Sequence, residues 1–389
     1  MADKGSQLDF SAVISAARTQ VAEEGLRGLS MRKVAARAGN SRGGVTSQAG
    51  DKAGLLAGLL ADALEFQRRK HKRWLDLTSS LDTSSPEVIA AVVRSFLNEA
   101  VTQERSHSLV LCELVAASAR RKIHHDDLAI LVEEEEMFWC RLQGDAPNTA
   151  ILGWAIANYC RDELPFALAL QGQAEYHLLR SATISRLVQR FAPMGEQGFA
   201  VGFERFVTRD ESSITNDDSD LNPGKRRSHE LGQAIAGLIQ REGIDGVTHR
   251  SVAASAGVAN SSVAHHYRTR EDLLKGGLVE IYRQLIKADH MLGRPLDVVP
   301  DMTLSIASHS IAIEATRDVS LVPFALNLRK MRGEFILQEL ASLLGPARSD
   351  LAALQAMGMI IVGAGLSLHL AGGEILLPMR LLERLISNS

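Results

Sequence analysis

Two short segments of the 389-residue chain combine small apolar residues with side chains that hydrogen-bond well to nucleic-acid bases. In the first segment, Arg42 could pair through two hydrogen bonds with a guanine edge, and in the second, Asn260 suits adenine in the same way. Neighbouring serine side chains can serve several bases. Such side chains read a sequence only when a structural element carries them into the major groove, so the surrounding elements decide what they can do.

The two segments belong to one repeated module. "RKVAARAGNSRGGVTSQAGDKAGLL" occupies 32–56 and "RSVAASAGVANSSVAHHYRTREDLL" occupies 250–274, so a shift of 218 superimposes them. In a wider window of 36 positions around them, 13 residues are identical. A weaker likeness continues between 105–120 and 317–332, which indicates that a whole half of the chain is duplicated.

The spacing of apolar residues predicts an all-α fold. Apolar positions recur every three or four residues almost throughout, and strand-like alternation is nearly absent. The stretch 208–224 is acidic, rich in Ser and Asn, and ends in Pro-Gly. That composition cannot bury a core, so we expect a flexible linker between two halves.

Turn residues within the module predict a helix, a tight turn and a second helix. Thr248 can cap a short helix over 249–256, which ends at Gly257, where a left-handed residue is least costly. A second short helix is expected over 259–267, and a longer one begins near Arg270. A helix pair joined by a glycine-containing turn can place its second helix in the major groove, although an ordinary helical hairpin shares the pattern.

The run "VTHRSVAASAGVANSSVAHHYRTREDLL" resembles the DNA-binding domain of the tetracycline-repressor (TetR) family of transcriptional regulators. The residues that carry the resemblance are Thr248, Val252, Ala253, Ala256, Gly257, Val258, Val263, Tyr267 and the run Arg270-Glu271-Asp272-Leu273-Leu274. The resemblance implies a helical ligand-binding and dimerisation domain behind each DNA-binding domain. It also implies a dimer that reads a near-palindrome with sites about one helical turn apart.

Both modules depart from the family pattern. The tyrosine with which the family touches phosphate is Thr46 in the first module and Ala264 in the second. The first also has Ala49 where an aromatic residue normally anchors the helix, and Asn40 for the usual valine. We expect the first recognition helix to be able to touch DNA but to be held less firmly. The alternative is that the first module binds a protein partner and only the second contacts DNA.

The expected DNA contacts fall into two groups. The base-reading candidates lie on the second helix of each module: Arg42, Gly43, Thr46, Ser47, Asn260, Ser261, His265 and His266. The phosphate candidates are Ser41, Lys52, Lys225, Arg226, Arg227, Thr248 and Arg270. For the two histidines, a solvated surface pair is an equally open interpretation. A charge balance of +6 over 1–75 and +4 over 225–287, against −13 elsewhere, fits a polyanionic partner for both modules.

One chain with both halves resembles a covalent pseudo-dimer. Its expected domains are a first helix-turn-helix domain (1–56), a first helical ligand and dimerisation domain (57–207), the linker (208–224), a second helix-turn-helix domain (225–274) and a second helical domain (275–389). We call the two helix-turn-helix domains reader one and reader two. By the family's pattern, a four-helix bundle from 148–170, 181–192, 348–371 and 379–387 joins the halves. Gly358, Gly363, Ala364 and Gly365 would permit close helix approach, although such a run can equally be plain core packing.

Since the two recognition helices differ in sequence, we expect an asymmetric, pseudo-palindromic operator and a ligand-responsive repressor. Residues that could line a ligand pocket are Trp139, Trp154, Tyr159, Phe324 and Met331, although side chains at such helical spacing can equally be core. The partners expected are double-stranded DNA and an unknown small-molecule effector, with no cofactor. Further pairing of two chains is left open.

Other classes of protein find little support in the sequence. No P-loop, Gly-x-Ser-x-Gly or His-Glu-x-x-His motif is present, so we expect no enzyme. "HHDD" at 124–127 has the elements of a metal site, but adjacent helix residues do not face one another. The three cysteines show no metal spacing. "MADKGSQLDF" lacks the apolar core of a signal peptide, and we expect no membrane-spanning stretch and a cytoplasmic location.

Overall fold

The computed structural model of the chain describes residues 10–121, 126–144, 147–193, 223–289, 302–333, 337–371 and 379–387. Within these ranges the regular secondary structure is entirely helical, which confirms the all-α prediction. The helices of the first half are α1 (Phe10–Gly28), α2 (Met31–Arg37), α3 (Arg42–Ala49), α4 (Lys52–Thr78), α5 (Pro86–Val101), α6 (Arg105–Arg121), α7 (Asp126–Leu142), α8 (Pro147–Leu170) and α9 (Ala174–Val188).

The helices of the second half are α11 (Pro223–Glu242), α12 (His249–Ala256), α13 (Asn260–His266), α14 (Arg270–Asp289), α15 (Met302–Ala315), α16 (Val322–Lys330), α17 (Leu337–Leu344), α18 (Leu351–Leu370) and α19 (Met379–Ser387). Short 3₁₀ turns, η3 (Ile244–Gly246) and η4 (Val319–Leu321), precede α12 and α16. The long helix α4 runs on from the first reader and packs on α6 and α7, whereas α14 packs on α11. Most of the predicted linker, 208–222, lies outside the described residues.

The two readers fold alike because they share the residues that start and stop their helices. Ser30 and Thr248, which are 218 positions apart, cap α2 and α12 by accepting a backbone N–H from the third residue of each helix. Gly39 and Gly257 follow these helices, and each has φ of +65°. That left-handed conformation favours glycine, so the two helices end within one residue of equivalent positions.

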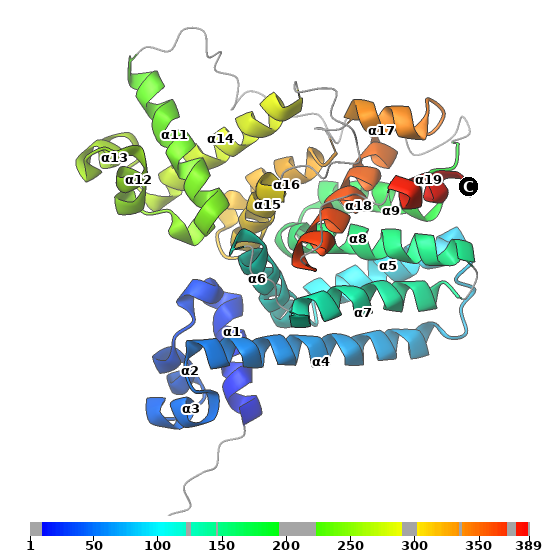
Figure 1. The fold of residues 1–389 in the computed structure, drawn as a ribbon, viewed down its shortest axis with the longest axis horizontal. Coiled ribbons are helices and arrows are strands. Elements are labelled where there is room, and N and C mark those ends of the chain that lie inside the picture. The colour runs from blue at the N-terminus through cyan, green and yellow to red at the C-terminus, as the bar shows by residue number, and fades with distance from the viewer. Residues whose placement is uncertain are drawn as a thin grey trace, which may run out of the picture.

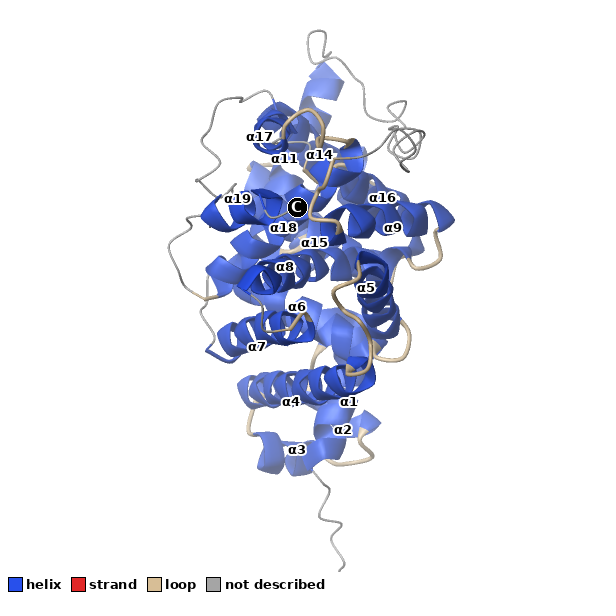
Figure 2. Ribbon diagram, turned by 90° about the vertical axis from the view of Figure 1, so that its right-hand side faces the viewer, coloured by secondary structure: helices blue, strands red, loops and turns tan. Residues whose placement is uncertain are grey.

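The body of the molecule is a stack of helices to which both halves contribute. Helices α4, α7, α8 and α18 pack side by side in that order, so the second half enters the stack at α18 (Figures 1 and 2). Helix α9 also packs on α18, and α19 packs on α8. These are the helices expected to join the halves, except that α9 spans Ala174–Val188 rather than 181–192. Helices α15 and α16 pack on α8 as well and widen the junction beyond the expected bundle.

Helices α8 and α18 approach one another at backbone distance. A Cβ atom placed on Gly363 of α18 would lie 2.0 Å from the carbonyl oxygen of Asn158 in α8. The close approach predicted for this glycine is therefore present. Gly358 instead packs against Gly333, within the second half.

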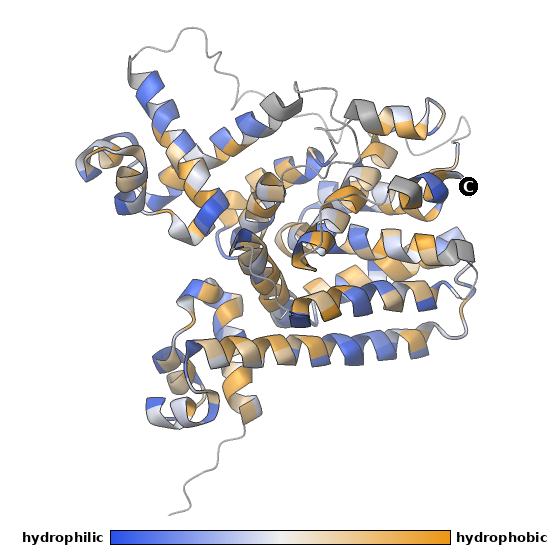
Figure 3. Cartoon of the chain, viewed as in Figure 1, coloured by the Kyte–Doolittle hydropathy of each residue, from blue (hydrophilic) through white to orange (hydrophobic). Residues whose placement is uncertain are grey.

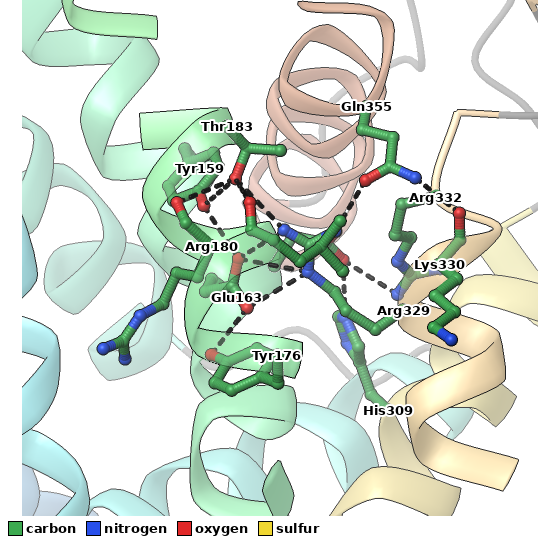
Figure 4. A network of polar contacts seen from close by, with 12 residues as sticks. Tyr159, Glu163, Tyr176, Arg180, Thr183, His309, Arg329, Lys330, Arg332 and Gln355 are labelled. Carbon is green, nitrogen blue, oxygen red and sulfur yellow. Dashed lines mark hydrogen bonds and ion pairs between the residues drawn. The ribbon is translucent and has the colours of Figure 1, made fainter. Parts of the chain in front are cut away.

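A buried polar network ties the halves together beside this crossing (Figure 4). Arg329 of α16 and Glu163 of α8 are both fully buried and form an ion pair at 2.8 Å. The hydroxyls of Tyr159 and Tyr176 donate to the same carboxylate at 2.9 and 2.8 Å. The guanidinium also donates to Gln355 of α18 at 3.3 Å. Each charge in this network is neutralised by a group from the opposite half.

One helix departs from the expectation that no stretch is long enough to cross a membrane. Helix α18, Leu351–Leu370, has the length and composition of a membrane span, with a mean hydropathy of 1.9 in its most apolar window. However, 83% of that window is buried inside the molecule. Its apolar surface packs against α8, α9 and α17, as expected for a core helix.

Candidate nucleic-acid interface

In reader one, the recognition helix α3 turns its predicted base-reading residues outwards. Arg42, Gly43, Thr46 and Ser47 are all exposed. Val45, on the opposite face, is 0% exposed and holds the helix against the reader core. Arg42 forms no ion pair with any residue that the structure describes, so its guanidinium fork is available to a ligand.

Reader two presents its recognition helix α13 in the same way. Asn260, Ser261 and His265 are exposed, while His266 is half-buried. Val263 is 0% exposed and occupies the position of Val45. The imidazole rings of His265 and His266 meet edge to face, with centroids 5.5 Å apart. The exposure of the two recognition helices is compatible with base contact, which stays a prediction for all eight base-reading candidates.

Both recognition helices lie on the same side of the molecule, while α9 and α19 lie on the other (Figure 1). The readers also meet directly, because Arg27 near the end of α1 pairs with Glu242 at the end of α11 at 3.7 Å. This pair is exposed and contributes little stability by itself. The arrangement nevertheless presents two unlike reading helices towards one side.

The missing aromatic anchor of reader one is replaced by side chains from another helix. In reader two, Tyr267 packs its ring on Gly276 and donates its hydroxyl to the Ser228 carbonyl at 3.1 Å. In reader one, the glycine equivalent to Gly276 is Gly58. A Cβ there would lie 2.4 Å from Ile14 and 3.1 Å from Phe10, both on α1.

Sequence reasoning anticipated a loosely held first recognition helix because it could not see this replacement. Ala49, at the position of the anchor, is buried with 7% exposure. The bulk at the equivalent site comes from Phe10 and Ile14, where the second reader has Ser228 and Gly232. The two copies therefore pack the same site with large residues from different helices.

The N-terminus of the recognition helix is capped in one reader only. Ser41 accepts a hydrogen bond from the Gly44 backbone N–H at 3.0 Å, whereas Ala259 stands at the equivalent position of α13 and has no side-chain acceptor. Replacement Ala259→Ser should raise the free energy of unfolding by about 0.5–2 kcal/mol. Urea titration of the full chain tests this, with Ala254→Ser inside α12 as the control. A variant no more stable than the parent would contradict the assignment of Ala259 as an N-cap.

Two of the residues predicted to contact DNA phosphate make equivalent contacts in the two readers. Lys52 donates to the carbonyl of Leu26 at 3.2 Å, and Arg270 donates to the carbonyl of Ile244 at 3.4 Å. Both pairs are related by the shift of 218. Arg270 also pairs with Glu314 at 3.6 Å. These cations therefore tie the start of α4 to the end of α1 in reader one, and the start of α14 to η3, which follows α11, in reader two.

The remaining phosphate candidates are partly engaged. Arg226 and Arg227 lie in the hydrophilic first part of α11 (Figure 3) and pair with Glu230 at 3.5 and 2.9 Å. The side chain of Lys225 lies outside the described part of the chain. Ser41 and Thr248 use their hydroxyls as helix caps. A phosphate would have to compete with or supplement these contacts.

Sequence reasoning missed one matched pair of basic residues. Arg32 and Arg250 occupy equivalent positions at the starts of α2 and α12, and both are exposed. Neither forms an ion pair within the described ranges. Their identity across the two copies was the signal that could have identified them as further phosphate candidates.

The basic run at 67–74 is buried at its centre, at Lys70 and His71, while its other basic residues are exposed. Lys70 is 5% exposed and pairs with Glu104 at 2.7 Å. His71 stacks on Phe138 with ring centroids 4.4 Å apart. By composition such a run could be a second phosphate patch or a solvated helix end. Lys70 and His71 are buried and can be neither, and both interpretations stay open for the exposed residues.

A cavity lies behind the readers, at the junction of the two halves. It is lined by α4, α5, α6, α7 and α8 of the first half and by α15 and α18 of the second. Its wall is largely apolar, and its polar groups include Lys70, His107, Glu135, Arg161 and His309. Helix α6 also packs on α1 of reader one and on α11 of reader two. One wall of the cavity is therefore formed by α6, which contacts both readers.

None of the five residues predicted for a ligand pocket lines this cavity. Trp139 and Tyr159 are 0% exposed and Met331 is 6% exposed, all within the packed interior. Trp154 and Phe324 are half-buried, and each packs against one of two large hydrophobic clusters to which both halves contribute. Their spacing identified them as buried, but it could not tell a cavity-facing side chain from one that packs on a neighbouring helix.

The fold and the two exposed recognition helices define a helix-turn-helix DNA-binding protein. The family model for bacterial regulatory proteins of the tetR family matches residues 13–59 and, separately, residues 233–276. The chain is therefore a DNA-binding transcription regulator with two domains that match the tetR family, one at the start of each half. No curated protein matches the chain.

Proposed function

We propose that the chain is a ligand-responsive repressor that reads an asymmetric, pseudo-palindromic operator with both of its readers. One observation carries this proposal: the two readers expose unlike recognition helices on one side of the molecule. Reader one offers Arg42 to a guanine edge, and reader two offers Asn260 to an adenine edge. A single chain thereby supplies the two readers that a homodimer would supply, but its readers recognise two different half-sites.

The effector site in this proposal is the cavity at the junction of the halves. Arg317 of the second half supports the connection to the readers, because it donates to the carbonyls of Val21 and Ala22 in α1 at 3.0 and 3.1 Å. It also pairs with Glu113 of α6 at 2.7 Å. A ligand that favours a different packing of α6 would change the spacing of the readers. It can release DNA only by its difference in affinity between the two states.

The test uses a duplex selected from a random library by the full chain. Arg42→Ala and Asn260→Ala should each weaken binding to it by about 1–3 kcal/mol and relax the preference at one base pair, in opposite half-sites. Arg141→Ala, which removes an exposed arginine from α7, is the matched control and should leave affinity unchanged. Binding is measured by fluorescence anisotropy at several salt concentrations.

The same titrations separate the competing interpretation of reader one. If Arg42→Ala leaves affinity, salt dependence and base preference unchanged while Asn260→Ala does not, reader one does not contact the operator. A protein partner for its exposed α3 surface would then be the better proposal. If neither variant changes the preference, the assignment of both recognition helices is wrong.

A further inference from the structure

The cavity at the junction of the halves contains charged groups that are already neutralised by the protein. Lys70 pairs with Glu104 at 2.7 Å, and its ammonium lies 3.8 Å from the centroid of the Phe96 ring. Arg161 pairs with Glu135 at 2.7 Å. Each of these four ionic groups is at most 9% exposed. A ligand therefore meets ion pairs rather than isolated charges.

The imidazoles at the cavity add no charge at neutral pH. Burial lowers the pKa of His107 to about 4, although Asp62 lies 3.8 Å away. Burial also lowers the pKa of His309, which shares a hydrogen bond of 2.7 Å with Asp162. That aspartate is in turn paired with Arg332 at 2.9 Å. All the charges around the cavity are thus balanced without a ligand.

We propose that this cavity binds a small, uncharged and mainly apolar molecule with one or two hydrogen-bonding groups. This inference rests on the proposed function, because it names the class of effector for the same site. An anion or a cation would bring a net charge into a site whose own charges are paired, and a buried unpaired charge is strongly disfavoured. The apolar wall rewards an uncharged molecule through the burial of nonpolar surface.

The size of the cavity limits the molecule to about one ring. It leaves about 60 Å³ for the centres of water-sized groups. Since one water needs roughly 10–15 Å³ on that scale, the space holds about four to six such groups. Gln67 and His107 at its wall supply hydrogen-bonding groups that are not part of the buried ion pairs Lys70–Glu104 and Arg161–Glu135.

Three probes of nearly equal shape test the charge preference. Benzyl alcohol, benzoate and benzylammonium are titrated into the full-length protein at neutral pH and followed by calorimetry and thermal shift. Benzyl alcohol should bind at least about ten-fold more tightly than either charged probe. Tighter binding of benzoate or benzylammonium would overturn the proposal. So would the absence of binding by all three, because the cavity would then not accept this class of molecule.

A single carboxylate should control the preference. Glu135→Gln removes the closest carboxylate from the Arg161 guanidinium, while Glu136 remains 3.7 Å away. This variant should gain about ten-fold or more in benzoate affinity. Glu133→Gln makes the same charge change at an exposed position of α7 and should behave like the parent protein. An unchanged preference in Glu135→Gln would show that Arg161 does not face the ligand.

These measurements are made without DNA, so they stand apart from the operator titrations. If the protein binds the selected duplex but no uncharged probe, the proposed DNA recognition stands and the proposed class of effector is wrong. If it binds benzyl alcohol but shows no base preference, the operator proposal is wrong and the proposed ligand class of the cavity stands.

Discussion

Replacement Arg329→Met should lower the free energy of unfolding by about 3–5 kcal/mol. The change leaves the fully buried carboxylate of Glu163 without its cation, while Tyr159 and Tyr176 still donate to it. A methionine fills most of the volume, so the loss reports the unpaired charge rather than an empty space. Urea titration of the full chain, followed by far-UV circular dichroism, measures the effect.

The partner variant makes this prediction specific to the pair. Glu163→Gln alone leaves Arg329 buried without its carboxylate and should also destabilise the protein. The double variant buries no unpaired charge and should be more stable than Arg329→Met alone. Arg226→Met, at an exposed ion pair, should change stability by less than about 1 kcal/mol. If Arg329→Met also changes the free energy of unfolding by less than about 1 kcal/mol, the network does not hold the halves together.

Replacement Gly363→Ala should also destabilise the protein, by more than about 2 kcal/mol. Alanine is the better helix former by about 0.5–1 kcal/mol, so propensity alone would stabilise α18. Against this, the new Cβ would lie 2.0 Å from the oxygen and 2.6 Å from the carbonyl carbon of Asn158. Those atoms belong to the backbone of α8 and cannot move aside as a side chain can. The clash therefore outweighs the propensity and pushes the halves apart.

A second glycine provides the control for this prediction. A Cβ on Gly172, in the turn between α8 and α9, would meet no atom within 4 Å. Gly172→Ala should therefore leave both stability and DNA affinity near those of the parent. Gly363→Ala should weaken DNA binding as well, because the separation of α8 and α18 changes the spacing of the readers. Equal stability of the two variants would show that α8 and α18 do not cross at Gly363.

Local signals made the readers and the fold class predictable from the sequence. Thr248 as a cap and Gly257 as a turn act within a few residues, and the structure has both as expected. The repeat then extended the same interpretation to the first copy. Gly363 was also identifiable, because a small residue within an apolar helix marks a possible close approach.

Contacts between distant segments were not predictable in this way. Glu163 and Arg329 are 166 positions apart, and neither lies in a motif. Only their placement within otherwise apolar helices could have marked them as buried. In reader one, Phe10 and Ile14 fill the site of the missing aromatic anchor. This could be predicted only if the packing of α1 on α4 were already known. The cavity is likewise formed by seven helices from both halves.

In the proposed complex, one chain supplies both readers of the operator. Native mass spectrometry of the full chain with its selected duplex measures the number of chains per DNA directly. We expect one chain per duplex at saturation, with the same stoichiometry for Arg42→Ala and Asn260→Ala despite their weaker binding. Two chains per duplex, with affinity insensitive to Arg42→Ala, would mean that each chain contributes only reader two, and the single-chain proposal would be wrong.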